Sequence, residues 1–340
     1  MVPGRRWGLW RLARAVLPLA VLTACPQLLK DDFYAMSGDD PSSGGDPVLR
    51  ASLDAGGPDG PGGPGAAPKK PPPPPPPRPP DASKGLDAGL PDTPPLSPVQ
   101  VALQAALRHR YRFDSDARDS VGGFDGVAVG GATFSGGAAV LSGAGTGPYI
   151  DLPNGLLSGL HNASFEVWVI WDVPDPTKTT ASWQRIYDLG RNPSTVEDQQ
   201  CQLDADATAL YLTPRISGSS PSTLQLKCET CGETRVDAPS LPVGVQVQLV
   251  AVVDDDANLL SLYRDGVLLG SPQAYPGSIS QITNCTGRPA PCDWNNWLGR
   301  SQHIEDPPFQ GRILDFRIYD AALSATQVQA SFADGPDSDW

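Results

Sequence analysis

Apolar and polar residues alternate with a period of two along much of residues 111–320, a pattern typical of β-strands. In residues 164–171 this alternation places Phe165, Val167, Val169 and Trp171 on one face. The opposite face of the same segment is also mostly apolar. The segment is therefore predicted to be a central strand that is covered on both sides.

The same period recurs over residues 245–253. Residues 259–263 and 267–269 flank Asp265-Gly266, a pair that supplies the positive φ angles of a two-residue turn, so these segments predict a hairpin. Only residues 103–108 and 324–330 have a helical pattern. The periodicity therefore predicts an all-β sandwich, but it does not decide the order of the strands.

Residues 1–24 have the features of a bacterial export signal. Several arginines precede an apolar run at residues 15–22, which is far shorter than the roughly 20 residues that span a bilayer. The run ends in Leu22-Thr23-Ala24-Cys25, which resembles a lipobox. This resemblance implies cleavage before Cys25 and attachment of lipid to its thiol, which would anchor the chain stably to a membrane. The alternative is an ordinary cleaved signal in which Cys25 has no role.

Residues 25–98 are rich in Pro, Gly, Asp, Ser and Ala, so they are predicted to form a disordered tether. The proline run at residues 71–77 predicts a stiff polyproline II rod within it. The tether is either a spacer between lipid and domain or a ligand for a proline-binding domain. Pro26, and not Asp, follows Cys25. In Gram-negative bacteria, the absence of Asp at this position favours passage of a lipoprotein to the outer membrane. The outer membrane is therefore the expected location, with the domain facing the periplasm or the cell surface.

Charge separates the tether from the predicted domain at residues 99–340. The chain has a net charge of −13, and residues 101–340 carry 15 basic and 28 acidic side chains. The first 100 residues carry ten of each sign. An acidic domain repels phosphate backbones, which argues against nucleic acid as a partner and is compatible with divalent cations.

The segment from Trp297 to Val328 carries an ordered series of motifs: Leu-Gly-Arg-Ser, then Asp306-Pro-Pro-Phe, then a strand at residues 313–319 and a short helix. It resembles the C-terminal signature of laminin G-like domains of the concanavalin A-like lectin and glucanase superfamily. Further matches follow in family order at residues 110–114, 119–123, 183–190 and 262–266, so the resemblance covers residues 107–328. It implies a two-sheet antiparallel jelly-roll sandwich.

Many domains of this family bind a structural Ca²⁺ through loop carboxylates, which suits a hard cation that prefers oxygen ligands. The resemblance places Asp119 at a frequent ligand position. A second ligand position corresponds to Leu314 here, and Asp315 follows one residue later. A shift of one residue along a strand sends a side chain to the opposite face. Asp119 is alternatively an ordinary turn residue.

Five cysteines follow Cys25, and an exported chain favours disulfides between them. Cys285 and Cys292 enclose a loop of six residues and are predicted to pair. Cys201 is expected to pair with Cys228 or Cys231, which leaves one thiol free or joined to another chain. The Cys228-x-x-Cys231 spacing lacks the βαβ context of a redox motif, so structural disulfides are the better interpretation.

Lectin-like sandwiches recognise sugars with aromatic rings and with Asn, Asp and Arg side chains. The segment around residues 294–300 contains this mixture, and Trp294 is expected to be its exposed aromatic side chain, whereas Trp297 is expected to pack in the core. The candidate ligand-binding residues are Trp294, Asn295, Asn296, Arg300, Trp183 and Tyr275. The acidic run at residues 254–256 is a second cation candidate, but its position between two strands favours a solvated hairpin tip.

Catalysis is not expected. Glucanases with this general fold place Glu-x-Asp-x-(x)-Glu on one strand so that nucleophile and general acid lie close together. Glu166 is followed by Val167 and Trp168, so this spacing is missing. The leading hypothesis is a lipoprotein whose domain binds glycan or protein ligands without catalysis. The alternatives are a structural interaction module of the cell envelope that binds no sugar and, third, a glycosidase-like enzyme.

Overall fold

The computed structural model describes residues 95–194, 196–202, 207–216, 222–228, 232–287 and 290–339. The predictions for the signal, for Cys25 and for the tether up to residue 94 lie outside these residues, as does Cys231. The backbone of Cys228 is described, but its side chain is not. No helix in the described ranges has both the length and the apolar character that crossing a membrane requires.

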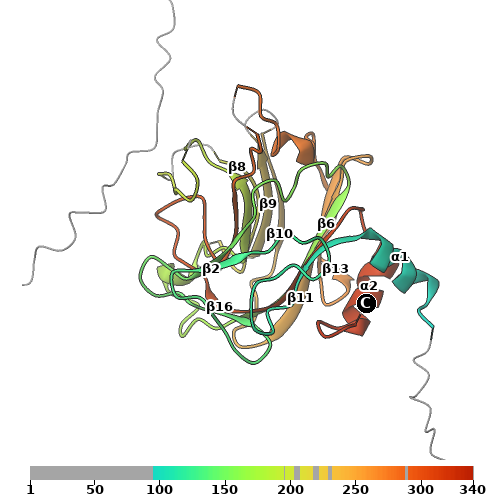
Figure 1. Cartoon of the computed structure of the whole chain (residues 1–340), viewed down its shortest axis with the longest axis horizontal. Coiled ribbons are helices and arrows are strands. Elements are labelled where there is room, and N and C mark those ends of the chain that lie inside the picture. Colours follow the sequence, from blue (N-terminus) through green and yellow to red (C-terminus); the bar gives the residue numbers. More distant parts are fainter. Residues whose placement is uncertain are drawn as a thin grey trace, which may run out of the picture. The chain divides into compact units, whose positions relative to one another are not determined.

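Two antiparallel β-sheets make up the domain, as predicted (Figure 1). Within the described residues, sheet A has nine strands in the order β13-β12-β11-β6-β16-β4-β3, with β1 also pairing β16 and β14 also pairing β12. Sheet B has seven strands in the order β10-β9-β8-β7-β15-β5-β2. Strands that are distant in sequence are neighbours in both sheets, which is the arrangement of a jelly-roll sandwich.

The strands of sheet A are β1 (Leu107–Tyr111), β3 (Thr133–Phe134), β4 (Ala139–Ser142), β6 (Ala163–Trp171), β11 (Gln246–Asp254), β12 (Leu259–Arg264), β13 (Val267–Leu268), β14 (Gln273–Ala274) and β16 (Gln310–Tyr319). The strands of sheet B are β2 (Val127–Val129), β5 (Tyr149–Leu152), β7 (Tyr187–Arg191), β8 (Thr208–Thr213), β9 (Ser222–Cys228), β10 (Gly232–Ala238) and β15 (Asn295–Leu298). The described helices are α1 (Pro98–Ala106), α2 (Ala325–Asp334) and the short 3₁₀ segments η1 (Thr179–Ala181) and η2 (Ile279–Gln281).

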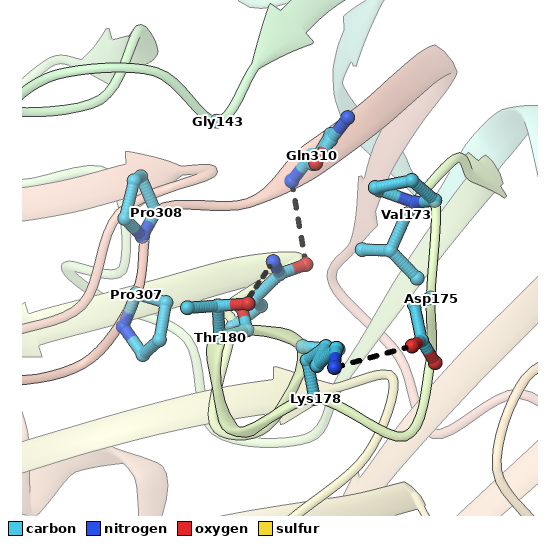
Figure 2. Close-up of a pocket in the computed structure, with 11 residues that line it drawn as sticks. Gly143, Val173, Asp175, Lys178, Thr180, Pro307, Pro308 and Gln310 are labelled. Atoms are coloured by element: carbon cyan, nitrogen blue, oxygen red, sulfur yellow. Dashed lines mark hydrogen bonds and ion pairs between the residues drawn. The ribbon is translucent and has the colours of Figure 1, made fainter.

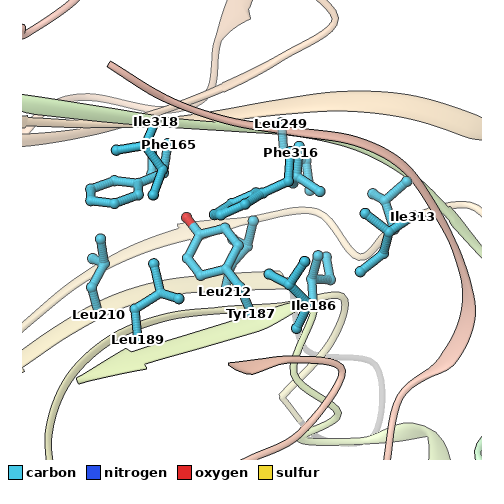
Figure 3. Packing of buried hydrophobic residues seen from close by; sticks show 14 of the residues in the cluster. Phe165, Ile186, Tyr187, Leu189, Leu210, Leu212, Leu249, Ile313, Phe316 and Ile318 are labelled. Carbon is cyan, nitrogen blue, oxygen red and sulfur yellow. The ribbon is translucent and has the colours of Figure 1, made fainter. Parts of the chain in front are cut away.

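The core lies between the two sheets, where alternate residues of each strand point inward. Figure 3 shows Phe165, Phe316 and Ile318 of sheet A facing Tyr187 and other apolar side chains of sheet B. The Tyr187 ring packs between its aromatic partners, 6.3 Å from the Phe165 ring and 5.7 Å from the Phe316 ring. The period-two pattern thus specified which side chains enter the core.

Strand β6 is the central strand that the sequence predicted. It pairs with β11 on one side and β16 on the other, and all nine of its residues are buried. Its outer face is covered because α1 and α2 lie side by side against sheet A (Figure 1). Leu103 of α1 and Val328 of α2 belong to the apolar cluster that forms there.

Helix α1 begins earlier than the apolar pattern predicted, and helix α2 ends later. Ser97 caps α1 in a capping box with Gln100, and Pro98 occupies its first turn, so the helix starts five residues before the predicted position. Ser324 and Gln327 form the same motif at the start of α2. The predicted hairpin turn is also confirmed, with φ angles of 51° at Asp265 and 78° at Gly266.

Candidate functional site

Two adjoining pockets lie at the end of the sandwich where β16 begins. The first, called here the lysine pocket, has a volume of about 250 Å³. The second, the arginine pocket, has a volume of about 270 Å³. The described lining of the lysine pocket is Gly143, Val173, Pro174, Asp175, Lys178, Thr180, Ala181, Gln184, Pro307, Pro308 and Gln310. The described lining of the arginine pocket is Gly145, Thr146, Gln200, Arg300, Ser301, Ile304, Asp306 and Pro308. Pro308 belongs to both, so the two are neighbours.

In the lysine pocket, Pro307 and Pro308 form one wall and Val173 and Asp175 the other (Figure 2). The Lys178 ammonium lies 3.8 Å from the Asp175 carboxylate, an exposed ion pair at the pocket rim. Apolar walls with a few polar groups are the usual make-up of small-molecule sites.

The amide of Gln184 is fixed at the base of the lysine pocket. Its Oε1 accepts hydrogen bonds from Nε1 of Trp171 at 2.9 Å and from the backbone N–H of Gln310 at 3.3 Å. Its Nε2 donates to the carbonyl of Thr180 at 2.9 Å. Strands β6 and β16 hold the two donors to Oε1, and the Thr180 carbonyl accepts from Nε2. These contacts keep the Gln184 amide in one orientation.

The arginine pocket rests on the outer face of sheet B. Strand register aligns Tyr211 with Asp188, Asp188 with Trp297, and Trp297 with Asp151 across four neighbouring strands. Alternate residues of a strand point to one face, so these four side chains share the face away from the core. The Arg300 guanidinium lies over the Trp297 ring, 4.4 Å from its centroid, a favourable cation–π distance.

Arg300 is also held from two other directions. Its guanidinium lies 4.5 Å from the centroid of the Tyr149 ring. Its Nη2 donates a hydrogen bond to the carbonyl of Asp198 at 3.0 Å. The planar cation is therefore positioned by two aromatic rings and one carbonyl, which pre-organises it at the pocket wall.

The loop between the pockets is tied to sheet B through Asp306. Its carboxylate accepts a 2.6 Å hydrogen bond from the Ser301 hydroxyl and lies 2.8 Å from the Arg185 guanidinium. Arg185 is fully buried and stacks on Tyr211 at 4.0 Å. It also contacts the Asp188 carboxylate at 3.3 Å.

A glycine permits the close approach of the opposite wall. Gly147 has a φ of 84°, and a Cβ there would collide with Pro308. Residues 143–147 therefore approach the proline wall because position 147 has no side chain.

The electrostatic field of this face is negative. Burial, followed by the charges of Asp198 and Glu197, raises the pKa of Asp151 to about 7, although Trp297 and Arg300 oppose the shift. Burial also raises the pKa of Asp188 to about 6 against the attraction of Arg185. These carboxyls hold their protons more tightly than solvated ones.

The structure separates the predicted sugar-binding residues. Arg300 lines a pocket, and Trp183 is half-buried with its ring 5.7 Å from the Arg185 guanidinium. Trp294, Asn295, Asn296 and Tyr275 are instead buried. The expectation that Trp294 is exposed was therefore wrong, because only 8% of its surface is accessible. Trp297 is buried as expected, but under Arg300 on sheet B rather than between the sheets.

The buried asparagines serve the fold. Oδ1 of Asn295 accepts a hydrogen bond from the backbone N–H of Asp198 at 3.1 Å. Nδ2 of Asn296 donates to the carbonyls of Pro153 at 3.0 Å and Asp293 at 2.7 Å. Tyr275 belongs to the central core cluster. These polar groups join loops to strand β15, so residue type alone did not distinguish them from ligand contacts.

The carboxylate of Asp119, the first calcium candidate, is occupied by donors of its own loop and of strand β1. Its carboxylate accepts backbone N–H hydrogen bonds from Arg110, Val121, Gly122 and Phe124 at 2.9–3.1 Å. It also contacts Nδ1 of His109 at 2.7 Å. Although burial opposes it, these partners hold the pKa of Asp119 below its usual value.

Asp315, the second calcium candidate, is buried between Arg110 and Arg317, at 2.7 Å and 2.9 Å. A β-bulge between Ile313 and Asp315 directs Ile313 and Phe316 into the core and Asp315 away from it. Both carboxylates face N–H donors, and the described residues hold no group of three or more His, Cys, Asp or Glu placed for a metal ion. The surroundings of Asp119 and Asp315 do not fit Ca²⁺. Calcium binding by the chain as a whole stays a prediction.

In the acidic run at residues 254–256, Asp254 ends strand β11 and the next two residues begin a turn that is not fully solvated. Asp255 is buried, and its carboxylate accepts a 2.5 Å hydrogen bond from the Ser278 hydroxyl. His161 contacts Asp256 through Nε2 at 2.9 Å. The turn is therefore fastened to two neighbouring loops.

The Cys285–Cys292 disulfide is confirmed. Cys201 is also disulfide-bonded, and its partner lies outside the described side chains. The choice between Cys228 and Cys231 therefore stays a prediction, as does the fate of the remaining thiol.

Residues 144–329 match a laminin G-type family model described as the concanavalin A-like lectin/glucanases superfamily. The match covers more than half of the chain, so the protein belongs to this superfamily. No curated protein is significantly similar to it in sequence.

Several solved structures are similar to this chain at low identity. Domain 4 of AbnA, a GH43 extracellular arabinanase from Geobacillus stearothermophilus in complex with arabinotriose, is 23% identical, with a TM-score of 0.44 over 66% of this chain and 97% of its own. The CBM40 of Ruminococcus gnavus IT-sialidase, bound to α2,3 sialyllactose, is 16% identical, with a TM-score of 0.38 over 54% and 94%. Botulinum neurotoxin type C is 10% identical, with a TM-score of 0.46 over 69% and 52%.

Most pocket residues were not predicted as site residues. Gln184, Asp306 and Pro308 lie inside motifs that identified the family, but the motifs did not show which of their side chains face a pocket. Gln200 and Thr146 lie in loops with no recognisable signal.

Proposed function

We propose that the domain is a non-catalytic glycan-binding module whose ligand occupies the lysine and arginine pockets together. The observation that carries the proposal is the adjacency of two small pockets, each with pre-positioned polar groups, in a member of a lectin and glucanase superfamily. Each pocket lies below the roughly 300 Å³ at which drug-sized ligand sites begin. An extended chain of sugars with one ring in each pocket fits this division better than one compact ligand.

The polar lining suits sugar hydroxyls, which both donate and accept hydrogen bonds. Lys178 and Arg300 supply N–H donors, while Asp175 and Asp306 supply acceptors. Pro307, Pro308 and Ile304 supply apolar surface for the C–H faces of the rings. This mixture of directional and apolar contacts is what a concave ligand site requires.

The charge arrangement supports binding without hydrolysis. Glycosidases need two carboxyl groups that face each other across the scissile bond. Of its described lining residues, each pocket has a single acidic side chain, and each of these is paired with a cation: Asp175 with Lys178, and Asp306 with Arg185. Glu166, on the central strand, is fully buried beneath α2 and faces no pocket.

The pockets can be tested with a matched pair of glycine variants. Gly147→Ala places a methyl group against Pro308, whereas Gly131→Ala adds a methyl group to open space at a similar positive φ of 90°. Both variants carry backbone strain, but only the first displaces the shared wall. Binding of the full chain is measured on a glycan array and then by calorimetry.

We expect Gly147→Ala to lower the affinity for the selected glycan at least fivefold relative to Gly131→Ala. Lys178→Ala should weaken binding about three- to tenfold, the effect of losing one hydrogen bond of ordinary net strength, about 0.7–1.4 kcal/mol, at an exposed side chain. Arg118→Ala, which removes another exposed cation, is its control. An array without any binding, together with an envelope protein recovered by crosslinking, would instead support the structural interaction module.

We further propose that the module is held at the bacterial outer membrane by lipid on Cys25, with residues 25–98 as a tether. The lipobox-like sequence and the proline-rich composition support this proposal. Labelled palmitate should be incorporated into the full chain and not into Cys25→Ala. Protease treatment of intact cells then distinguishes the cell surface from the periplasm. Incorporation into Cys25→Ala would contradict the anchor.

A further inference from the structure

We infer that the paired pockets favour glycans without acidic groups, and that sugars with protonated amines bind most strongly. This inference rests on the proposed function and adds the chemical class of the ligand. It follows from how the charged side chains beside the arginine pocket are already engaged.

Arg300 is the cation that lines the arginine pocket, but it is poorly placed to neutralise an acidic ligand. Its Nη2 donates to the Asp198 carbonyl, and its guanidinium lies between the Tyr149 and Trp297 rings. Its Nε is buried. A carboxylate that binds arginine in the strongest geometry needs two parallel N–H donors on one edge. Both such edges of the guanidinium include Nη2, which already donates to the protein, and Nε is buried with no hydrogen-bond partner among the described residues.

Carboxylates outnumber the cation around this position. Asp198 and Glu197 both raise the pKa of Asp151, whereas Arg300 lowers it, so two carboxylates act against one guanidinium at this position. Nε1 of Trp297 donates a hydrogen bond to the Asp198 carboxylate at 3.3 Å. The indole is neutral, so it does not cancel the charge of this carboxylate. Asp198 and Glu197 are exposed, which leaves their charges at the surface where a ligand would enter.

The other charged pairs of the site cancel within the protein. Asp306 is paired with Arg185 at 2.8 Å, and Asp175 with Lys178 at 3.8 Å. The excess negative charge therefore comes from Glu197 and Asp198, because the Asp151 carboxyl keeps most of its proton at pH 6.5. The raised pKa of Asp151 agrees with this field, because neighbouring negative charges oppose its ionisation.

The test compares three β1,4-linked or similarly extended oligosaccharides of equal length, carrying N-acetylated amines, free amines or uronic acid groups. Calorimetry measures their binding to the full chain at pH 6.5, at low and at high salt. We expect the free amine form to bind at least threefold more tightly than the N-acetylated form, and the uronic form at least threefold more weakly. High salt should reduce both differences, because it screens exposed charges.

Asp198→Asn tests whether the charge of this residue causes the preference for amines. Its amide oxygen can still accept the hydrogen bond from Trp297. Asp198→Asn should reduce the ratio between the affinities for the free amine form and the N-acetylated form by about half. Asp320→Asn should leave this ratio unchanged. Asp320 is also exposed but follows the far end of β16. Uronic oligosaccharides that bind as tightly as the N-acetylated form would overturn the inference while leaving the proposed function standing. Failure of all three to bind would overturn the proposed function and the inference with it.

Discussion

The carboxylate of Asp306 lies 2.8 Å from the guanidinium of Arg185, and this ion pair joins the loop between the two pockets to sheet B. Arg185 has no solvent contact of consequence, since only 2% of its side chain is exposed. Two of its other partners, the Asp188 carboxylate and the Tyr211 ring, belong to strands β7 and β8. The shape of the site therefore depends on a charge that is buried beneath it.

Asp306→Asn should test this dependence. Loss of one partner leaves the buried Arg185 charge less compensated, and Asp188 makes up only part of the loss. We expect the free energy of unfolding to fall by about 2–4 kcal/mol and glycan affinity to fall more than tenfold. Denaturant unfolding and calorimetry measure the two effects. Glu305→Gln, on the same loop but exposed, should change neither. Equal effects of the two variants would rule out a special role for the pair.

Glu166→Gln should destabilise the contact between α2 and sheet A. The Glu166 carboxylate accepts hydrogen bonds from Ser331 at 2.7 Å and Tyr319 at 2.9 Å, and it lies 3.5 Å from Arg317. Removing its charge should lower the free energy of unfolding by about 3 kcal/mol, as for other buried ion pairs. Asp320→Asn, which breaks only the exposed pair with Arg108, should cost at most about 1 kcal/mol.

Glu166 should also contribute to acid unfolding. Burial by itself would raise its pKa, but Arg317 and the hydrogen bonds outweigh burial and hold the pKa below the ordinary value of 4.5. A lowered pKa in the folded state gives stability that is present above the unfolded value and is lost as the pH falls through the folded value. The stability of Glu166→Gln should therefore fall less steeply than that of the parent below about pH 4.5. Equal slopes of stability against pH below about pH 4.5 in the parent and in Glu166→Gln would contradict this.

His161 should titrate above its ordinary value. Its hydrogen bond to Asp256, with further attraction from Asp255 and Asp254, raises its pKa above 6.5. The associated stability is present below 6.5 and is lost as the pH rises through the folded value. Proton NMR of the full chain should show this raised pKa, and Asp256→Asn should lower it. An unchanged His161 titration in that variant would exclude Asp256 as the main cause.

Asp151, like His161, should make the folded state less stable as the pH rises. Its pKa is raised from 3.8 to about 7, so the folded state retains a proton that the unfolded state releases. Stability therefore declines as the pH rises from about 4 to about 7. Asp151→Asn should remove that decline and increase the melting temperature at pH 8 relative to the parent, with little difference at pH 4. Thermal unfolding at both values provides the measurement, and a variant that is less stable at pH 8 would contradict it.

The Cys285–Cys292 disulfide should stabilise the fold moderately. The two residues are seven positions apart, so the crosslink restricts a short loop of the unfolded chain. The double variant Cys285→Ser, Cys292→Ser should lose about 2–2.5 kcal/mol of unfolding free energy by the loop-entropy relation. The reduced parent protein is not a suitable comparison, because Cys201 is also disulfide-bonded. A loss below about 0.5 kcal/mol would show that the oxidised loop is strained or that the unfolded loop is already ordered.

Local patterns predicted the strands well. Phe165 and Val167 enter the core because adjacent strand residues point to opposite faces, a property that the sequence records directly. The Asp265-Gly266 turn was predictable for the same local reason. The start of α1 was missed because Ser97 and Gln100 act through capping and not through apolar spacing.

The site was far less predictable. Trp294 and Asn295 have the residue types of a sugar site, but both are buried, Trp294 just before strand β15 and Asn295 at its first position. Asp315 has the residue type of a metal ligand, but the bulge in β16 turns it toward two arginines. Burial and the choice of partner depend on segments far away in the sequence, such as that of Arg110, which lies 205 positions before Asp315, and no local pattern specifies them.

The sequence by itself determined the sandwich and the family, because alternation, turn chemistry and ordered motifs are local properties of the chain. Only the tertiary structure decided where a ligand fits. Gln184, Arg300 and Pro308 come from segments that the strand order brings together, and the pockets are formed by their juxtaposition. A pocket is a relation between distant residues, so it exists only once the two sheets have packed.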